Sequence, residues 1–518
     1  MRIGIDVGGT HTDAVIMRGS EVLAATKAET SANVSDGILA ALETVLELSG
    51  IAEIDVEAVM LGTTQFTNAV VERRELSHVA AIRLGLPSGR GLEPKAGWPD
   101  DIAEALGGRS YLLEGGFLYD GRELSPFDER AATAVVEDIA ARAIDCVSIA
   151  SAFSPMNPEP ERRMAAMLRD KLPNVRITES HRIGRLGILE RENAALLNAA
   201  LLSFAERVVS SFAAALKARG LTCPFFVSQN DGTLMDASFV REFPALTFAS
   251  GPTNSLRGAA RLTGLDNAIV IDIGGTTSDI GVLQDGFPRE SNLVIEVGGV
   301  RTNFRMPDIL ALGLGGGSLV DEQGTSIGPK SVGHRLMQEG RVFGGDTLTA
   351  TDIVVAAGKA QIGDVSRVTD LDAGVVDAAL TKIRTMLNDG IERMKPSSDA
   401  LPVILVGGGA ILLTSKPDAA AELHRPEHSD VANAIGAAIA QVGGEAERMV
   451  SYEEVPRKEA LAQIGQEAVE LAVAAGAERS TVAVADIEET TLSYMDGGTT
   501  RVRVKAVGEV ALLSGAAS

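Results

Sequence analysis

The sequence predicts an α/β protein built of two lobes that face one cleft. The first observation behind this prediction is a repeat: DVGGTHTD at residues 6–13 returns near mid-chain as DIGGTTSD at residues 272–279. IGI precedes the first copy and IVI the second, while AVI and IGV follow them. Each copy therefore predicts a buried strand, a tight polar turn and a second apolar strand. The second observation is that short apolar strands and amphipathic helices alternate in both halves, so that each half carries one hairpin.

Length and composition limit the class of protein. The 518 residues predict two or three domains, and 45% hydrophobic with 23% charged residues is typical of a globular chain. The net charge of -23 argues against nucleic acid or an anionic membrane as a partner. Cys146 and Cys223 are the only cysteines, so we expect a cytoplasmic protein without a disulfide framework or structural zinc. With no leader-like start and no long apolar run, we expect neither a signal peptide nor a transmembrane helix.

The first part of the chain, residues 1–180, is predicted to form the lobe that carries the first hairpin. A helix is expected from an N-cap at Ser35 to Gly50. The Gly/Pro-rich segment 85–121 reads as an irregular insertion in which Trp98 packs structurally. The expected strands cover residues 2–7, 15–18, 58–62, 79–84 and 146–150.

Residues 181–444 are predicted to form the second lobe, and residues 445–518 a small appended α+β region. The second lobe would contain a long helix over 185–219, the strand FFVSQ, the second hairpin and the strand PVILV. Further helices are expected at 351–358, 377–394 and 429–442. In the appended region we expect a helix over 457–475 and strands over 481–486 and 500–507.

The repeated hairpin has the chemistry to hold a polyphosphate with its magnesium from two sides. Glycine lets the backbone approach phosphate oxygens and adopt positive φ, and hydroxyls can donate hydrogen bonds to the same oxygens. Asp6 and Asp272 stand at strand ends, where paired carboxylates would hold Mg²⁺ directly or through water. Asp13 and Asp279 are interpreted as fixing the turns by accepting backbone hydrogen bonds. The other predicted phosphate-binding residues are Gly8, Gly9, Thr10, Thr12, Gly274, Gly275, Thr276 and Thr277. One copy alone would also suit an ordinary hairpin turn; two matched copies favour a phosphate site.

A third glycine cluster, Gly407, Gly408 and Gly409, follows the strand PVILV and could let a nucleoside lie against bare backbone. A simple loop entering a helix is the alternative. The three sites together match the actin, Hsp70 and sugar-kinase superfamily, whose two-lobed, ribonuclease H-like ATPase fold is thereby predicted. The helix over 429–442 would connect the lobes, because its small residues permit close packing. Neither a Walker A motif nor a Rossmann fingerprint occurs in the chain.

Several longer motifs follow one another in an order that resembles the hydantoinase/oxoprolinase family, specifically its A-type subunit. They are IGIDVGGTHTDAVI, LGTTQFTNAVVERR, SAFSPMNPEPE, SQNDGTLM, FASGPTNSLRGA, IDIGGTTSDIGVL, ALGLGGGSLVD and TATDIVVAAG. The resemblance covers roughly residues 1–444 and implies an ATP- and Mg²⁺-dependent subunit that opens a cyclic amide, such as a hydantoin, oxoproline or a lactam. It also implies a second subunit as partner, and we expect an oligomer.

The resemblance also bears on individual residues. It places Gly315, Gly316 and Gly317 along the nucleotide cleft, although a plain flexible loop is the alternative. His11 stands where the family usually has Phe, so it could carry a proton, contact a phosphate or pack in the turn. Glu179 and His181, in TESHRIG, match a family-like segment and are weak candidates for substrate chemistry.

Two other functions remain open from the sequence. A small-molecule kinase of the same fold would need an aspartate facing a substrate hydroxyl. An ATP-driven activator of a partner enzyme would use its nucleotide state to change lobe closure. Membership of a fold cannot decide among the three functions, and the ordered family motifs favour the first.

Overall fold

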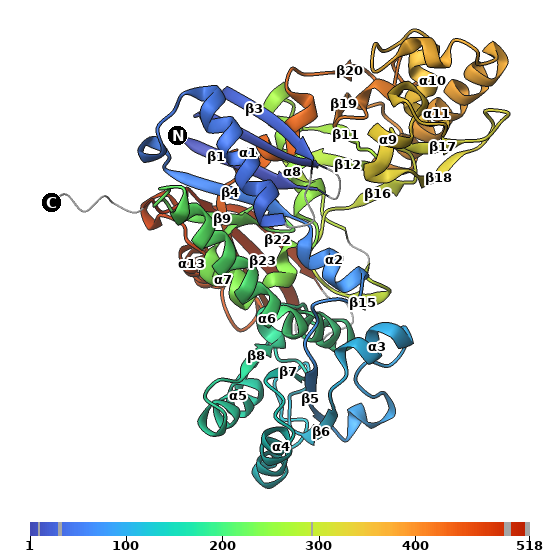
Figure 1. The fold of residues 1–518 in the computed structure, drawn as a ribbon. Coiled ribbons are helices and arrows are strands. Elements are labelled where there is room, and N and C mark those ends of the chain that lie inside the picture. Colours follow the sequence, from blue (N-terminus) through green and yellow to red (C-terminus); the bar gives the residue numbers. More distant parts are fainter. Residues whose placement is uncertain (9–10, 30–33, 292–293, 492–498, 513–518) are drawn as a thin grey trace.

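Two α/β lobes carry the two hairpins, and a smaller parallel sheet lies beside the first lobe (Figure 1). The computed structural model describes residues 1–8, 11–29, 34–291, 294–491 and 499–512. The first lobe contains a nine-stranded sheet, the second a six-stranded sheet, and the smaller body a four-stranded sheet. The predicted two-lobed α/β fold is therefore confirmed.

The first lobe's sheet gathers strands from both ends of the chain. In sheet order they are β22 (Ala483–Thr491), β23 (Thr499–Gly508), β21 (Val442–Ser451), β10 (Leu234–Asp236), β9 (Phe225–Ser228), β4 (Ala58–Thr63), β1 (Arg2–Val7), β2 (His11–Arg18) and β3 (Glu21–Glu29). The second lobe's sheet runs β13 (Phe287–Pro288), β12 (Ser278–Gln284), β11 (Ala268–Ile273), β19 (Val403–Val406) and β20 (Leu423–His424), with β16 (Ile309–Leu312) pairing β12.

The smaller sheet is entirely parallel, in the order β6 (Ser110–Glu114), β5 (Val79–Leu86), β7 (Cys146–Ser151) and β8 (Arg176–Glu179). Two hairpins stand outside these sheets: β14 (Ile295–Val297) with β15 (Val300–Thr302), and β17 (Ser318–Val320) with β18 (Ile327–Ser331). The α-helices are α1 (Val34–Ser49), α2 (Gln65–Val71), α3 (Asp100–Leu106), α4 (Glu129–Ala141), α5 (Glu159–Lys171), α6 (Ile188–Ala218), α7 (Ala237–Glu242), α8 (Ser250–Thr263), α9 (Leu336–Glu339), α10 (Ala350–Ala356), α11 (Ala373–Met394), α12 (Ala432–Ile439) and α13 (Arg457–Ala474).

The cores of the two lobes repeat one strand pattern. In β3-β2-β1-β4-β9 the first three strands are antiparallel and the last two continue parallel to β1. The order β13-β12-β11-β19-β20 has the same directions. The register repeats as well, because Asp6 pairs with Asp13 and Asp272 pairs with Asp279. This is the ribonuclease H-like strand order that the repeated motif predicts.

Helices α8 and α12 join the lobes by packing tightly against each other. Helix α8 lies on β11, β12 and β19 of the second lobe, whereas α12 lies on β1, β2 and β4 of the first. The contact is too close for side chains: a Cβ at Gly436 would meet the carbonyl oxygen of Asn254 at 1.9 Å, and one at Gly258 would meet that of Ala432 at 1.9 Å. The predicted connecting helix therefore exists, although it ends at Ile439 and the chain enters strand β21 at Val442.

The C-terminal residues extend the first lobe's sheet. The expected helix and strands are found as α13, β22 and β23, but β21 pairs with both β10 and β23, so the strands join the nine-stranded sheet. The division of the chain at residues 180 and 444 stays a prediction, and strand pairing crosses both points. Without β21, strand β10 would be an edge strand with unpaired backbone N–H and C=O groups, and β21 pairs with it although the two strands are distant in sequence.

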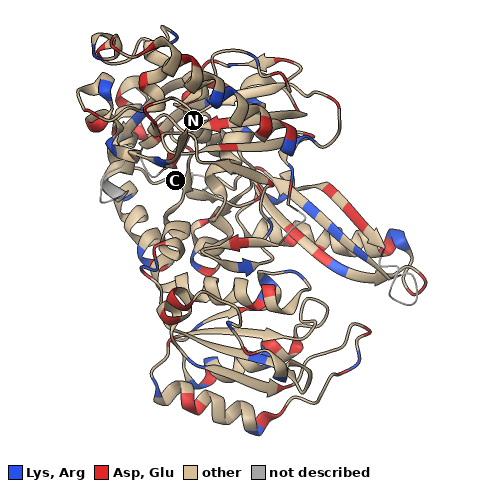
Figure 2. Cartoon of the chain, turned by 90° about the vertical axis from the view of Figure 1, so that its right-hand side faces the viewer, with Lys and Arg blue, Asp and Glu red and all other residues tan. Residues whose placement is uncertain are grey.

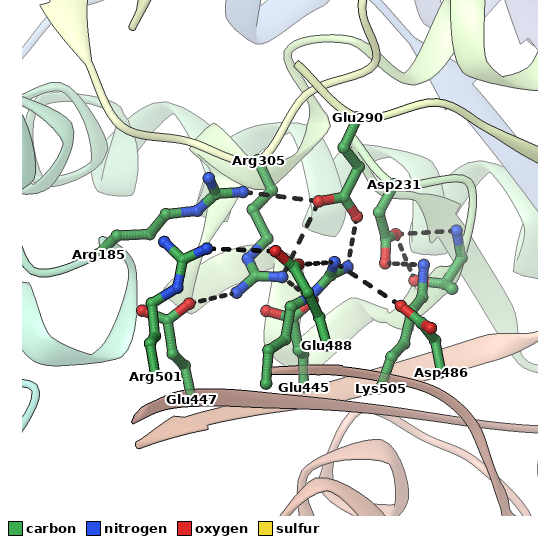
Figure 3. A network of polar contacts seen from close by, with 12 residues as sticks. Arg185, Asp231, Glu290, Arg305, Glu445, Glu447, Asp486, Glu488, Arg501 and Lys505 are labelled. Atoms are coloured by element: carbon green, nitrogen blue, oxygen red, sulfur yellow. Dashed lines mark hydrogen bonds and ion pairs between the residues drawn. The ribbon is translucent and has the colours of Figure 1, made fainter. Parts of the chain in front are cut away.

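A network of charged side chains holds these C-terminal strands in place (Figure 3). Figure 2 shows basic and acidic residues distributed along the projecting β22–β23 hairpin. Arg503 pairs with Glu445 at 2.8 Å and with Glu290 at 2.5 Å, and Arg305 pairs with Glu447 at 2.8 Å. Glu290 and Arg305 lie in the connection between β13 and β16, so the network links the two lobes at a second place.

The structure bears on several local expectations, of which some changed and one is confirmed. The segment 85–121 contains α3 and β6 and is less irregular than expected, while Trp98 is buried and donates a hydrogen bond to Asn193 at 2.9 Å, which confirms its structural role. Helix α1 begins at Val34, so Ser35 lies inside it. Among the described helices, only α6 is long and apolar enough to cross a membrane, and 44% of its most apolar stretch is buried. The core helix of a globular protein can have the same length and composition.

The contact between α8 and α12 can be tested with one methyl group. We expect Gly436→Ala to lower the free energy of unfolding by about 2 kcal/mol or more, because the new Cβ would have to displace backbone. Gly465→Ala in α13 is the control, since its Cβ would meet nothing closer than 3.6 Å. The control should be neutral or stabilising by up to about 1 kcal/mol. Urea unfolding measures both; equal stability of Gly436→Ala and the parent chain would contradict the close contact.

Candidate functional site

The two hairpin turns face each other across a cavity of about 370 Å³ between the lobes. Each turn is closed by its backbone: Gly8 N–H donates to His11 O at 3.0 Å, and Gly274 N–H donates to Thr277 O at 2.9 Å. Thirteen predicted residues line the cavity: Asp6, Gly8, His11, Asp13, Asp272, Gly274, Gly275, Thr277, Asp279, Gly316, Gly407, Gly408 and Gly409. The three predicted sites therefore lie around one cavity.

Five aspartates line this cavity and concentrate negative charge there: Asp6, Asp13, Asp272, Asp279 and Asp430. Burial raises the pKa of Asp6, and nearby Asp272 adds to the rise, while the amides of Asn433 and Asn254 oppose it. Burial also raises the pKa of Asp272, which accepts a hydrogen bond from the Ser255 hydroxyl. The pKa values of Asp13 and Asp279 are both raised to about 7, chiefly by burial. A cavity with this charge favours a bound cation.

Lys27 supplies a positive charge to this cavity. It extends from β3, where it pairs in register with Asp13, and its Nζ lies 2.6 Å from Asp13 Oδ1. Lys27 was not among the predicted site residues, because strand β3 was not predicted. A lysine placed directly opposite Asp13 would have been the available signal.

Asparagines from the two connecting helices also reach Asp6. Asn433 of α12 donates to Asp6 Oδ2 at 3.2 Å. Asp6 Oδ1 and both polar side-chain atoms of Asn254 in α8 are buried without a hydrogen-bond partner among the described residues. Unpaired buried polar atoms are costly, so they indicate a place for water, a cation or a ligand. Sequence patterns gave no signal for either asparagine, because each depends on how α8 and α12 cross.

The third glycine cluster has a structural reason for lacking side chains. Gly407 adopts φ +87°, and a Cβ there would lie 2.2 Å from Asp272 Oδ1. Gly409 donates its N–H to Ile273 O at 2.7 Å. Gly408 is different, since its Cβ would meet only Lys27 Cε, at 3.9 Å. Gly407 and Gly409 thus hold the second hairpin, while Gly408 presents open backbone to the cavity.

The glycine run before β17 supports the same hairpin. Gly316 and Gly317 donate their N–H groups to Gly274 O at 3.0 Å and Gly275 O at 2.7 Å. Gly315 approaches so closely that a Cβ would lie 2.6 Å from the Thr276 backbone. Gly316 lines the cavity, whereas Gly315 and Gly317 do not, so the prediction for those two is corrected: they brace the hairpin from behind.

Two threonines also depart from the prediction. Thr12 is fully buried and absent from the cavity lining, because successive residues of β2 face opposite sides and His11 and Asp13 take the cavity side. Its counterpart Ser278 is likewise buried and donates to Leu314 O at 2.6 Å. Thr276 is exposed and does not line the cavity either. Gly9 and Thr10 lie outside the described residues.

The interpretation of Asp13 and Asp279 as turn-fixing residues was wrong for their side chains. Both carboxylates line the cavity, and the turns are closed by backbone hydrogen bonds. Within the described ranges, no group of three or more His, Cys, Asp or Glu side chains could hold a metal ion alone. Magnesium is commonly held by one or two carboxylates together with waters and substrate phosphates. Asp6 and Asp272, with the unpaired Asp6 Oδ1, fit that mode.

Comparison with known families agrees with this geometry. Residues 2–172 match the hydantoinase/oxoprolinase N-terminal region, and residues 191–450 match the hydantoinase/oxoprolinase domain. The chain belongs to the hydantoinase/oxoprolinase family. The resemblance inferred from its ordered motifs is thereby confirmed.

Curated relatives of this family member act in more than one named reaction. The alpha subunit of caprolactamase from Pseudomonas jessenii is 28% identical over 435 residues, which cover 76% of this chain and 60% of the relative. The gamma subunit of acetophenone carboxylase from Aromatoleum aromaticum is 28% identical and is matched over 69% of this chain and 53% of its own length. The chain thus spans little more than half the length of these relatives.

Two solved structures share the fold of this family member over almost its whole length. The ATP-dependent caprolactamase from Pseudomonas jessenii gives a TM-score of 0.76 with 20% identity, covering 99% of this chain and 88% of that chain. Nucleotide-free acetone carboxylase gives a TM-score of 0.69 with 19% identity, covering 98% and 88%. At these identities the likeness concerns the fold.

Gly407 allows a direct test of the cavity wall. We expect Gly407→Ala to lower the free energy of unfolding by about 2 kcal/mol, because the new Cβ meets both an unfavourable φ and the Asp272 carboxylate. Gly408→Ala is the matched control and should change stability by less than about 0.5 kcal/mol. Thermal and urea unfolding measure the difference, and two equally tolerated variants would argue against the close approach.

The raised pKa of Asp279 predicts a pH-dependent stability. Its carboxyl titrates near 3.8 when unfolded and at about 7 when folded, so stability is lost as pH rises between these values. We expect Asp279→Asn to remove this loss, making the variant more stable than the parent at pH 7, by up to about 4 kcal/mol, and little different near pH 4.

Urea unfolding at both pH values, without nucleotide or divalent cation, measures the effect. Asp285→Asn, in the exposed turn after β12, is the control and should leave the pH profile unchanged. A parallel profile for Asp279→Asn and the parent chain would contradict the assignment.

Proposed function

We propose that this chain is an ATP-dependent subunit that activates a cyclic amide, or a related carbonyl, by phosphorylating its oxygen. The observation that carries the proposal is the single cavity in which both glycine hairpins, five aspartates and a third glycine cluster meet. Membership of the hydantoinase/oxoprolinase family and the printed names of caprolactamase and carboxylase relatives support it. ATP is the proposed nucleotide and Mg²⁺ the proposed cofactor.

The reaction needs activation because an amide carbonyl is a poor electrophile and its oxygen a poor leaving group. Transfer of the γ-phosphoryl forms a bond to the carbonyl oxygen while the bond between the γ-phosphorus and the bridging oxygen breaks, releasing ADP. Water can then attack the activated carbon, and the ring C–N bond breaks as the nitrogen takes up a proton. The acyl phosphate that results is hydrolysed by a second water to a carboxylate and inorganic phosphate. Catalysis of this kind is mostly positioning and charge neutralisation.

The residues divide this work by position. Asp6 and Asp272 would hold Mg²⁺, which supplies positive charge to the phosphates when bound. The backbone N–H of Gly275 and the Thr277 hydroxyl would donate to phosphate oxygens, while the N–H groups of Gly8 and Gly274 close the turns that let the backbone approach them. Gly408 offers bare backbone for the nucleoside. His11 lines the cavity and remains a candidate for phosphate contact or proton transfer.

A second subunit is proposed as the partner that completes hydrolysis. The relatives are named as subunits, and the chain covers 60% of the caprolactamase alpha subunit and 53% of the acetophenone carboxylase gamma subunit. Purified chain should therefore bind Mg·ATP alone, while ring opening of a hydantoin, oxoproline or lactam should appear only when the partner is added. A stable phosphorylated product would instead identify a small-molecule kinase. ATP turnover stimulated by a bound protein without small-molecule conversion would identify an activator.

Removal of either central aspartate should separate catalysis from folding. We expect Asp6→Asn and Asp272→Asn to lower substrate-stimulated ATP turnover by about a hundredfold or more, because the charge that holds the cation is lost. Neither change should destabilise the chain, since burial already disfavours both carboxylates. Coupled-enzyme turnover and urea unfolding measure the two effects, with Asp285→Asn as control. Full turnover in either variant would remove its proposed role.

A further inference from the structure

A second cavity, of about 660 Å³, opens at the carboxyl edge of the parallel sheet β6-β5-β7-β8. Chain segments around β8, the β9–β10 turn, residues 303–305 and strand β21 all contribute to its wall. In open parallel sheets, ligands bind in the crevice outside the carboxyl ends of the strands, near the point where strand order reverses. Here the order reverses between β5 and β7. The cavity shares no lining residue with the one between the hairpins, within the described part of the chain.

His181, just after β8, lines this cavity and is oriented by a buried carboxylate. Its Nδ1 lies 2.7 Å from Glu161 Oε2, and its backbone N–H donates to the same oxygen at 3.0 Å. Glu161 Oε1 accepts from the Ser180 hydroxyl at 2.6 Å and from the Ser151 N–H at 2.8 Å. Because Nδ1 contacts Glu161, Nε2 on the other side of the ring is the nitrogen that can contact a ligand in the cavity.

Buried positive charge keeps Glu161 ionised. Burial alone would raise its pKa, yet the hydrogen bond from His181 and the charges of His181 and Arg191 together hold that pKa below its usual value. Arg191 is fully buried and is itself fixed, donating to Ser180 Oγ at 3.0 Å and to Ser151 O at 2.6 Å. The Glu161 carboxylate thus fixes the orientation of the ring through Nδ1, and Nε2 is the ring nitrogen left to contact a ligand.

The acidic groups of the wall already have basic partners. Glu179 pairs with Arg169 at 2.9 Å, Glu447 with Arg305 at 2.8 Å, and Asp231 with Lys505 at 2.7 Å. Glu445 and Glu467 pair with Arg503 and Arg448. Figure 3 shows Arg305 inside this ion-pair network and Arg185 at one side of it, joined to Glu290.

One guanidinium group and two buried polar atoms of the wall remain available. Among the described residues, the exposed Arg162 guanidinium makes no ion pair or side-chain hydrogen bond. Arg185 pairs with Glu290 at 3.5 Å through a terminal nitrogen, but its Nε is buried and unpaired. Asn303 Oδ1 is also buried without a partner, and unsatisfied buried polar atoms favour a ligand that completes them. The available groups are therefore the Arg162 guanidinium, Arg185 Nε–H, Asn303 Oδ1 and His181 Nε2.

We propose that this cavity binds a small carboxylate that also carries an N–H group, such as an amino acid or an N-acylated amino acid. The carboxylate faces the Arg162 guanidinium, whose planar group matches its two oxygens, and Arg185 Nε–H supplies a further donor. The N–H donates to His181 Nε2. Because the five acidic groups of the wall lie nearby, a singly charged ligand is favoured over a phosphate.

The proposal does not depend on nucleotide binding, although the two cavities are close neighbours. Asn230 of the second cavity accepts from Ala249 N–H at 2.7 Å, and Ser255, six residues further along, contacts Asp272 of the first. Six residues of helix span about 9 Å. Because the two cavities share no described lining residue, failure of one to bind its ligand does not contradict the proposal for the other.

Three matched probes test the ligand class on the full chain without nucleotide. N-acetylglycine has both groups, N-acetylglycinamide lacks the carboxylate, and N-acetylsarcosine lacks the N–H. By titration calorimetry we expect N-acetylglycine to bind about tenfold more tightly than either analogue. Absence of saturable N-acetylglycine binding, or equal binding of N-acetylglycinamide, would overturn the proposal.

Variants then assign the contacts. Arg162→Gln should weaken N-acetylglycine binding about tenfold, whereas Arg130→Gln, on the exposed face of the neighbouring helix α4, should leave it unchanged. In His181→Phe the advantage of N-acetylglycine over N-acetylsarcosine should disappear. Asp6→Asn should bind N-acetylglycine as the parent chain does. Equal behaviour of Arg162→Gln and Arg130→Gln, or an unchanged probe preference in His181→Phe, would contradict the assigned contacts.

Discussion

The crossing of helices α8 and α12 is the contact on which the arrangement of the molecule depends. Helix α8 lies on the sheet of the second lobe and α12 on the sheet of the first, and at the crossing the backbone of one approaches the backbone of the other at Gly258 and Gly436. Backbone contact leaves no flexible side chain to absorb a shift, so the relative position of the lobes is well defined. That position brings two hairpins, 266 residues apart in sequence by the numbering of Asp6 and Asp272, to one cavity.

The same crossing also supplies the chemistry around the central aspartates. Asn254 and Ser255 lie on α8 and Asn433 on α12, so the helices that fix the lobes also carry the groups that surround Asp6 and Asp272. Burying these carboxylates in a cavity lined by five aspartates opposes folding, and Lys27 offsets only part of this charge. Stability given up in this way is typical of a functional site, where a bound cation restores the balance of charge.

The sequence predicted the features that local patterns encode. Two copies of one motif, with identical spacing and apolar flanks, predicted both hairpins, and together with the two other glycine clusters they predicted most of the described cavity lining. Features that depend on distant pairing were not predictable in the same way. Strand β21 completes a sheet begun by residue 2, and its register on β10 has no local signal. The side of the sheet on which the Thr12 side chain lies could have been predicted, because side chains alternate along β2 and His11 and Asp13 point to the other side. The motif alone nevertheless suggested that Thr12 contacts phosphate.

The two cavities differ in a way that the overall charge hides. A net charge of -23 would suggest that neither cavity attracts an anion. In the first cavity, acidic groups outnumber their basic partner, which suits a cation and, through it, phosphates. In the second, the acidic groups are matched by arginines and Lys505, and the groups left over are the Arg162 guanidinium, Arg185 Nε and Asn303 Oδ1. Local pairing, rather than net charge, therefore decides which ligand each cavity can accept, because nearby charges are screened far less across a low-dielectric cavity than across solvent.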